Sequence, residues 1–164
     1  MIYAIHILTI PLAIIYSHLT EWFIHKYILH GLGKRKDNFW SFHWHAHHKK
    51  CRKNNFYDVD YLDDWQGPPL REKLGLFLLI LLHSPLVIYA PLFFITLIFC
   101  AVRYYKVHKY AHLNPIWGKI FLTWHHDHHM GKDQDANWGV TVEWVDKLLG
   151  TRKKNAKIKK EESI

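Results

Sequence analysis

Two uncharged, largely apolar stretches dominate the pattern of hydrophobic and polar positions along this 164-residue chain. Residues 2–19 contain no Asp, Glu, Lys or Arg, and neither do residues 74–102. A helix of about 20 apolar residues crosses a bilayer, so both stretches are predicted to be membrane segments. Two such runs also exceed what the core of a small soluble domain can bury. The first stretch lacks a basic leader and a small-residue cleavage site, which favours an anchor over a removable signal peptide.

The residues between these stretches predict the remaining elements. The first helix is expected to continue from residue 2 to about residue 30, where Gly31 and Gly33 end it. A second helix should begin near Asn38 and run through the histidine-rich segment that follows. Residues 54–69 contain Asn, Asp, Gly and two adjacent Pro, which is typical of a loop. The aspartates of this loop are expected to be solvated caps.

The formal net charge of +8 is spread unevenly along the chain. No Lys or Arg precedes Lys26, but basic residues are dense at 34–36 and 49–53, and six more lie within 152–160. Positive charge beside membrane segments marks the cytoplasmic side. The absence of a known binding motif argues against a nucleic-acid partner. Two isolated cysteines are too few to suggest a disulfide framework or a cysteine metal site.

Fifteen histidines are present, and twelve of them lie within residues 25–48 and 108–129. Imidazole is a good ligand for iron, zinc and copper, so the two blocks are predicted to form one metal site. Both blocks must then lie on the same side of the membrane. The stretch at 74–102 is therefore expected to reverse near residues 89–91, with helices starting near Leu70 and ending near Ala111. A shallow re-entrant hairpin would satisfy the same requirement.

Helical spacing decides which imidazoles can share a metal. His108 and His112 are four residues apart and so lie on one helix face. His25 and His30 are five apart, so they either serve different metals or lie on a helix that unwinds before Gly31. The candidate ligands are His25, His30, His43, His45, His47, His48, His108, His112, His125, His128 and His129.

The number of these histidines is informative. A structural zinc site closes with four ligands, whereas about ten histidines suit two metals with about five ligands each. Five ligands leave an open position on an ion that accepts six. Metal-bound histidines usually donate their other ring N–H to an acceptor. Glu21, one turn before His25, and Asp127 are candidates for that role, with capping or solvation as the alternative.

Four histidine motifs in this order resemble the membrane fatty acid hydroxylase and sterol desaturase superfamily, whose pattern is HxxxxH, HxxHH, HxxxH, HxxHH. The chain contains "HKYILH" at 25–30, "HWHAHH" at 43–48, "HKYAH" at 108–112 and "HHDHH" at 125–129. The closing segment "ANWGVTVEWVDKLLGT" at 136–151 is also similar. One departure is Trp44, which stands where the second motif should begin, so either His43 or His45 must replace the missing ligand.

This resemblance implies an all-α integral membrane protein with one N-terminal membrane helix, a second apolar helical hairpin and a cytosolic, histidine-rich helical cap. Residues 1–151 would form this domain, and residues 152–164 a flexible basic tail. The resemblance further implies a non-haem di-iron centre with two iron ions, for which zinc can substitute, and O2 as co-substrate. The metal ligands themselves would be the catalytic apparatus.

The implied substrate is a membrane lipid, which the enzyme would hydroxylate or desaturate with electrons from an external donor such as a ferredoxin or cytochrome. A fatty acyl chain, a sterol and a carotenoid all fit, and "HKYILHG" also resembles bacterial carotenoid hydroxylases. The alternative is a non-catalytic membrane metal-binding or transport protein. Transporters carry ionisable ligands within their membrane segments, whereas these clusters flank the apolar stretches, which favours the enzyme.

Overall fold

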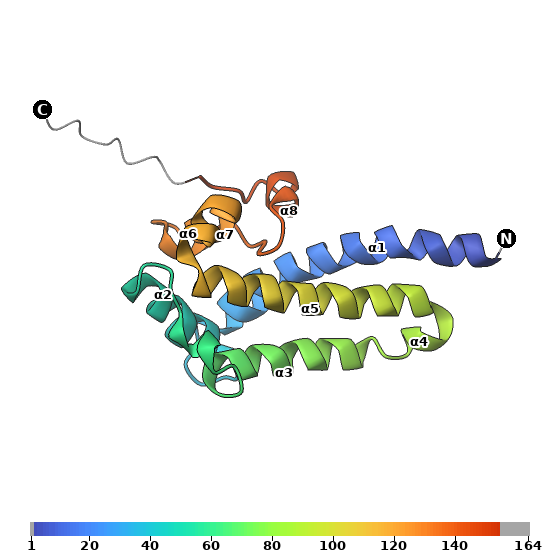
Figure 1. Ribbon diagram of the computed structural model, residues 1–164, viewed down its shortest axis with the longest axis horizontal. Coiled ribbons are helices and arrows are strands. Elements are labelled where there is room, and N and C mark those ends of the chain that lie inside the picture. Colours follow the sequence, from blue (N-terminus) through green and yellow to red (C-terminus); the bar gives the residue numbers. More distant parts are fainter. Residues whose placement is uncertain (1, 155–164) are drawn as a thin grey trace, which may run out of the picture.

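The computed structural model describes residues 2–154, with side chains from residue 7 onward, and every regular element in that range is a helix. The prediction of an all-α protein is confirmed for these residues. Three long helices lie side by side: α1 (Ile2–Phe23), α3 (Gly67–Leu82) and α5 (Pro91–Leu113). Figure 1 shows that most of the shorter helices, α4 excepted, gather at the end of this bundle opposite the N-terminus.

The first helix does not stay regular up to its end. α1 continues without a break into a π-helix, η1 (Ile24–Leu32), which ends at Gly33. A Cβ atom at Gly33 would lie 1.9 Å from the carbonyl oxygen of Leu29, so glycine is required there. A second π-helix, η2 (His43–His48), leads into α2 (Lys49–Lys53). The predicted helix end at Gly31–Gly33 is therefore right, but the sequence pattern did not predict the π-helical turns.

The predicted loop at 54–69 contains one short 3-10 helix, η3 (Val59–Leu62). Asp58 caps this helix by accepting a hydrogen bond from the backbone N–H of Asp60. However, the Asp58 side chain is fully buried, so the expectation that it is solvated is wrong. The loop folds inward, which places this carboxylate beside the histidines.

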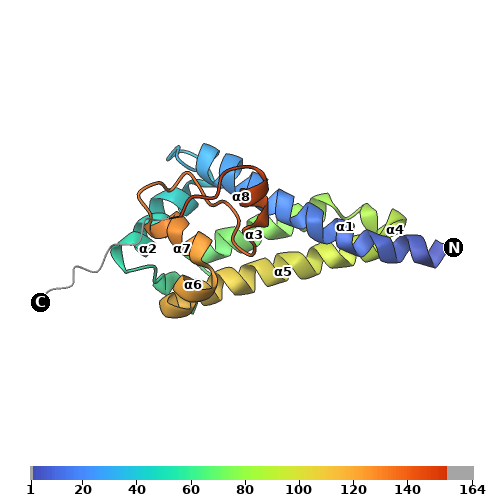
Figure 2. The ribbon, with the colours of Figure 1, turned by 90° about the horizontal axis from the view of Figure 1, so that it is seen from above.

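α3 and α5 run antiparallel, and the chain reverses between them through α4 (Leu86–Tyr89). Proline lies in the first turn of both long helices, where its missing N–H costs no hydrogen bond. In the two views of Figures 1 and 2, α4 lies at the same end of the bundle as the N-terminus. Among the described residues, one helix, Ile7–Leu32, is long and apolar enough to cross a membrane.

The remaining helices, α6 (Pro115–Phe121), α7 (Thr123–Met130) and α8 (Trp144–Leu148), cover the other end of the bundle. Residues 136–151 fold back onto α1, as Figure 2 shows from above. The carboxylate of Asp146 is fully buried and accepts hydrogen bonds from the backbone N–H groups of Trp138 and Gly139 and from the Trp22 indole. This carboxylate therefore fixes the C-terminal segment to the first helix.

The beginning of the predicted basic tail belongs to the folded part of the chain. The Arg152 guanidinium is 3.1 Å from Asp127 and 2.9 Å from Glu143, and its side chain is 8% exposed. The Lys153 ammonium pairs with Asp133 at 2.6 Å. The rest of the predicted tail, residues 155–164, lies outside the described residues.

Candidate metal centre

Ten histidines from both blocks meet at the end of the bundle opposite α4, in two adjacent clusters. The first cluster consists of His25, His30, His43, His48 and His128, and each ring offers one nitrogen that lies within 4.8 Å of those of the other four. The second consists of His47, His108, His112 and His129, which meet the same limit, and His125, whose Nε2 is 3.1 Å from that of His112. All ten rings are buried. The rings of His48 and His129 link the clusters, with centroids 4.1 Å apart.

The π-helix explains how the five-residue spacing works. In a π-helix the backbone hydrogen bonds run from residue i to i+5, so side chains five apart come together on one side. His25 and His30 accordingly belong to the same cluster, with ring centroids 5.2 Å apart. The spacing left two alternatives open, an altered helix or two different metals. The structure shows the altered helix, and it places both rings in the first cluster.

The second motif follows the same rule. His43 and His48 are also five apart on a π-helix, and their Nε2 atoms are 3.2 Å apart. His47, four residues after His43, lies in the second cluster instead. His45 lies outside both clusters, where its Nε2 is 2.9 Å from the carbonyl oxygen of Lys34. Of the two residues that could replace the histidine missing at Trp44, the structure thus places His43 in a cluster and His45 outside both.

The third and fourth motifs lie on regular α-helices. His108 and His112 on α5 share a face as expected, with ring centroids 4.8 Å apart. On α7, His125 and His129 point into the second cluster, with centroids 4.6 Å apart. His128 on the same helix joins the first cluster, where its Nε2 is 3.1 Å from that of His48. The second and fourth motifs are therefore each divided between the two clusters.

The outer nitrogen of most of these rings is held by an oxygen acceptor. In the first cluster, Nδ1 of His25 is 2.6 Å from the carbonyl of Trp138, and Nδ1 of His128 is 2.7 Å from that of Ala136. Nδ1 of His48 is 2.8 Å from the side-chain oxygen of Gln134. The C-terminal segment 131–138 therefore supplies most of the partners that orient this cluster.

Carboxylates orient two rings of the second cluster, and a backbone carbonyl orients a third. Nδ1 of His47 is 2.8 Å from the Asp58 carboxylate, and Nδ1 of His108 is 2.6 Å from that of Glu72. Nδ1 of His112 is 2.9 Å from the carbonyl oxygen of Phe56. Glu72 and Asp58 were missed from the sequence, because neither lies at a helical spacing from the histidine that it contacts.

The two carboxylates suggested by the sequence have other partners. Glu21 accepts hydrogen bonds from the backbone N–H groups of Val140 and Thr141, and Asp127 accepts one from Arg152. Both carboxylates fix the C-terminal segment instead of a metal ligand. The expectation that they orient histidines is therefore wrong.

The tautomers that follow from these contacts fit a metal centre. A carbonyl or carboxylate can only accept, so each Nδ1 that contacts one carries the proton, and the Nε2 of that ring keeps an exposed lone pair. Lone pairs cannot hydrogen-bond to each other, yet the Nε2 atoms of His108 and His112 are 3.2 Å apart. On a six-coordinate ion, metal–nitrogen bonds of about 2.1 Å at right angles place adjacent nitrogens about 3.0 Å apart. The donor set therefore suits a cation in each cluster.

Unpartnered nitrogens in the second cluster support the same conclusion. Within the described part of the chain, Nε2 of His47, Nδ1 of His125 and both nitrogens of His129 are buried without a hydrogen-bond partner. A buried polar atom left unpaired costs about 1–3 kcal/mol. A metal bound in this cluster would supply the missing partner for Nε2 of His47 and for one nitrogen of His129.

Burial also keeps the imidazoles in the form that binds metal. Desolvation, and after it the charge of neighbouring imidazoles, holds the pKa well below the ordinary value of histidine at six ring positions outside the N-terminal helix. These are His43, His47, His48, His125, His128 and His129. The rings are therefore neutral at pH 7, and metal binding need not displace protons from their Nε2 atoms.

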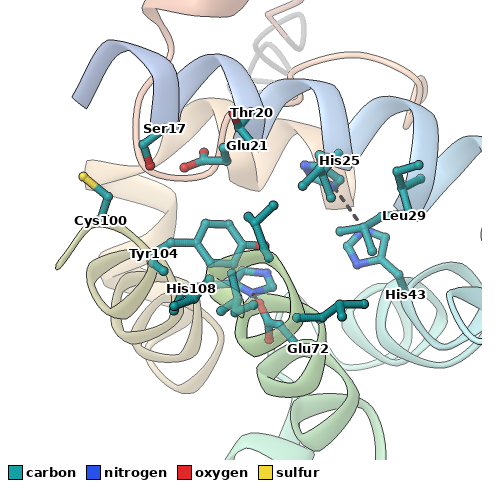
Figure 3. Close-up of a pocket in the computed structure, with 18 of the residues that line it drawn as sticks. Ser17, Thr20, Glu21, His25, Leu29, His43, Glu72, Cys100, Tyr104 and His108 are labelled. Atoms are coloured by element: carbon teal, nitrogen blue, oxygen red, sulfur yellow. Dashed lines mark hydrogen bonds and ion pairs between the residues drawn. The ribbon is translucent and has the colours of Figure 1, made fainter. Parts of the chain in front are cut away.

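A cavity of about 290 Å³ opens between α1, α3 and α5 and reaches both clusters. His25, His43, His47 and His108 line its inner end, and Figure 3 shows three of these rings turned toward the same space. Leucines and isoleucines of η1 and α3, such as Ile28 and Leu79, form much of its wall. The cavity therefore offers a hydrocarbon chain direct access to the histidines.

The family model described as fatty acid hydroxylase matches residues 10–151, which is most of the chain. No curated protein and no solved structure matches this chain. The match spans all four histidine motifs and the segment that folds back onto α1. The chain therefore belongs to the fatty acid hydroxylase family, within the membrane fatty acid hydroxylase and sterol desaturase superfamily.

Proposed function

We propose that this protein is a membrane-bound, non-haem di-iron oxygenase that oxidises a C–H bond of a lipid. The observation that carries the proposal is the apolar cavity whose inner end is lined by histidines of both clusters. Membership of the family supports lipid hydroxylation or desaturation as the reaction class. A fatty acyl chain, a sterol or a carotenoid would present the hydrocarbon that such a cavity accepts.

Two iron ions, one in each cluster, would supply the activation of dioxygen. Hydroxylation consumes the C–H bond, one O2, two electrons and two protons, and yields an alcohol and one water. The electrons must come from outside, since the sequence contains no recognisable cytochrome, flavin or ferredoxin motif. The exposed basic side chains Lys49, Arg52 and Lys53 lie directly after the second motif and suit an acidic electron carrier.

The chain's own residues would bind and orient the lipid. The walls formed by α1, α3 and α5 hold a hydrocarbon chain by apolar contact and exclude water from the reacting bond. Trp40 and Phe42 line the same cavity beside His43, so they restrict where the chain can lie relative to the first cluster. Which carbon is oxidised, and whether an alcohol or a double bond results, would follow from that position.

The family is membrane-associated, and the helix Ile7–Leu32 is apolar enough to span a bilayer. We place the bundle of α1, α3 and α5 in the membrane, with the metal centre at its cytoplasmic surface. Exposed apolar side chains along the bundle, among them Leu12, Phe77 and Phe99, support this placement.

A thiol-labelling experiment tests this placement. A membrane-impermeant thiol reagent should label a cysteine introduced at Lys36 from the cytoplasmic side, but not one introduced at Ile88. Equal labelling of both positions would contradict the proposed placement of the bundle in the membrane.

The test uses the full-length protein purified in detergent, loaded anaerobically with ferrous iron and supplied with a reductant, O2 and membrane lipid. We expect oxygen consumption that depends on lipid, and a lipid product that has gained one oxygen or lost two hydrogens, detected by mass spectrometry. The variant His43→Ala should abolish both. Stoichiometric zinc in protein from active cells, or bound iron without lipid oxidation, would favour the storage or transport alternative.

A further inference from the structure

The two clusters differ in the charge of the groups that hold their outer nitrogens. We propose that the two metal sites are unequal, and that the second cluster binds its metal more tightly and fills first. The inference depends on metal binding to the clusters and not on the lipid reaction proposed above. It can therefore be tested on protein that carries out no turnover.

Glu72 provides the clearest support for the second cluster. Its side chain is 9% exposed, and each oxygen accepts a different hydrogen bond. One oxygen is 2.6 Å from Nδ1 of His108, and the other is 2.6 Å from the hydroxyl of Tyr61. A carboxyl group that accepts on both oxygens is ionised, because a protonated one would have to donate from one of them. A buried negative charge therefore lies directly behind a metal-facing ring.

Asp58 repeats this arrangement at a second ring. Its carboxylate is fully buried, with one oxygen 2.8 Å from Nδ1 of His47 and the other 3.1 Å from the backbone N–H of Asp60. The Lys50 ammonium is 3.8 Å from this carboxylate, on a half-buried side chain. Two of the five histidines in the second cluster thus have an ionised partner.

The acceptors of the first cluster are mostly neutral. They are the carbonyl oxygens of Trp138 and Ala136 and the amide oxygen of Gln134. One carboxylate, that of Asp135, is 3.3 Å from Nδ1 of His30. However, its side chain is 52% exposed, and the Lys34 ammonium lies 2.6 Å away. Solvent and this lysine therefore offset most of its charge.

This difference in charge has a direct effect on metal affinity. A carboxylate that accepts the Nδ1 proton raises the basicity of Nε2 and fixes the ring, and losing such a partner typically lowers metal affinity about 10- to 100-fold. The negative charges of Glu72 and Asp58 also offset the charge of a buried dication. A neutral carbonyl or amide does neither to the same extent. The second cluster should consequently fill before the first.

The sequence offers a matched pair of isosteric variants. Glu72→Gln replaces the buried carboxylate behind the second cluster by an amide, and Gln134→Glu makes the opposite change behind the first. Cobalt(II) would be titrated into metal-free protein while its visible absorption is followed. The wild-type protein should bind two equivalents in two steps, and His108→Ala should remove the tighter step while His25→Ala removes the weaker one.

Glu72→Gln should lower the metal affinity of the tighter site about 10- to 100-fold, and Gln134→Glu should raise that of the weaker site. Both variants should therefore reduce the difference in affinity between the two sites. His45→Ala, outside both clusters, is the control and should leave both steps unchanged. Two equal wild-type sites, or a weaker step that responds to Glu72→Gln, would overturn the inference. If Glu72→Gln loses its helical circular dichroism, Gln134→Glu decides alone. If the protein binds cobalt in two steps but the iron-loaded protein does not oxidise lipid, that result would contradict the proposed function and leave this inference standing.

Discussion

At the scale of single residues, the metal centre depends on which ring nitrogen of each histidine faces inward. The acceptors at Nδ1 decide this, as the Trp138 carbonyl does for His25 and the Glu72 carboxylate does for His108. His45 shows the opposite case, because its ring contacts the carbonyl oxygen of Lys34 and stays outside both clusters. The two histidines that flank Trp44, His43 and His45, thus have different environments.

Substituting these two histidines separately tests that difference. We expect His43→Ala to lower metal affinity at the first cluster by at least about tenfold, because it removes one of five ring donors. His45→Ala should retain the metal content of the wild-type protein. Elemental analysis after dialysis against a weak chelator would measure both. Metal lost from His45→Ala and kept by His43→Ala would reverse the assignment.

At the scale of elements, two local features shape the centre. The π-helices η1 and η2 bring together histidines five residues apart, which a regular α-helix would separate by about 140°. The C-terminal segment then closes over the first cluster and is fixed to α1 by the buried carboxylate of Asp146. The histidine motifs provide the donors, and this segment provides the acceptors that orient several of them.

Replacing Asp146 by asparagine should loosen this segment. The N–H groups of Trp138 and Gly139 donate to different oxygens of Asp146. The amide oxygen of asparagine can accept from one of them, but its NH2 group then faces the other donor. We expect a loss of about 2 kcal/mol of stability. The apparent Tm in detergent would report it, together with weaker metal retention in the first cluster. Glu143→Gln, on the more exposed side of the same segment, is the control. An unchanged Tm would contradict the inference that the Asp146 carboxylate fixes this segment to α1.

At the scale of the whole molecule, one end of a three-helix bundle carries ten buried imidazoles and the other carries exposed apolar side chains. The cavity between α1, α3 and α5 connects the two regions. This arrangement joins a lipid-binding space to a metal centre within a single small domain. It also concentrates neutral histidines, so that the stability of the whole fold depends on pH.

Acidification should unfold the protein and release its metal. The folded-state pKa values of His48, His128 and His129 lie below the unfolded value of about 6.5, so the unfolded chain binds more protons as pH falls. Their contribution to stability is present above that value and is lost progressively below it. Circular dichroism and metal content between pH 8 and pH 4 would follow this, with the metal-loaded protein resisting longer. Stability that rises on acidification would contradict the expectation.

The sequence by itself determined which residues could bind metal and which stretches are apolar. Residue type and order are enough for both, because an imidazole is a potential ligand wherever it lies, and a helix of uncharged residues is apolar in any fold. His25, His30, His108 and His112 were therefore identified as candidate ligands, and the structure brings all four into the two histidine clusters. The fold class, the family and the helix end at Gly33 followed from the same kind of information.

Only the tertiary structure decided how the histidines divide into two clusters and what orients them. The division depends on π-helical turns at Ile24–Leu32 and His43–His48, whose altered hydrogen bonding has no simple sequence pattern. The buried partners Asp58 and Glu72 lie 11 and 36 residues from the rings that they contact. Contacts at such separations arise when helices pack together, and local spacing along the chain does not encode them.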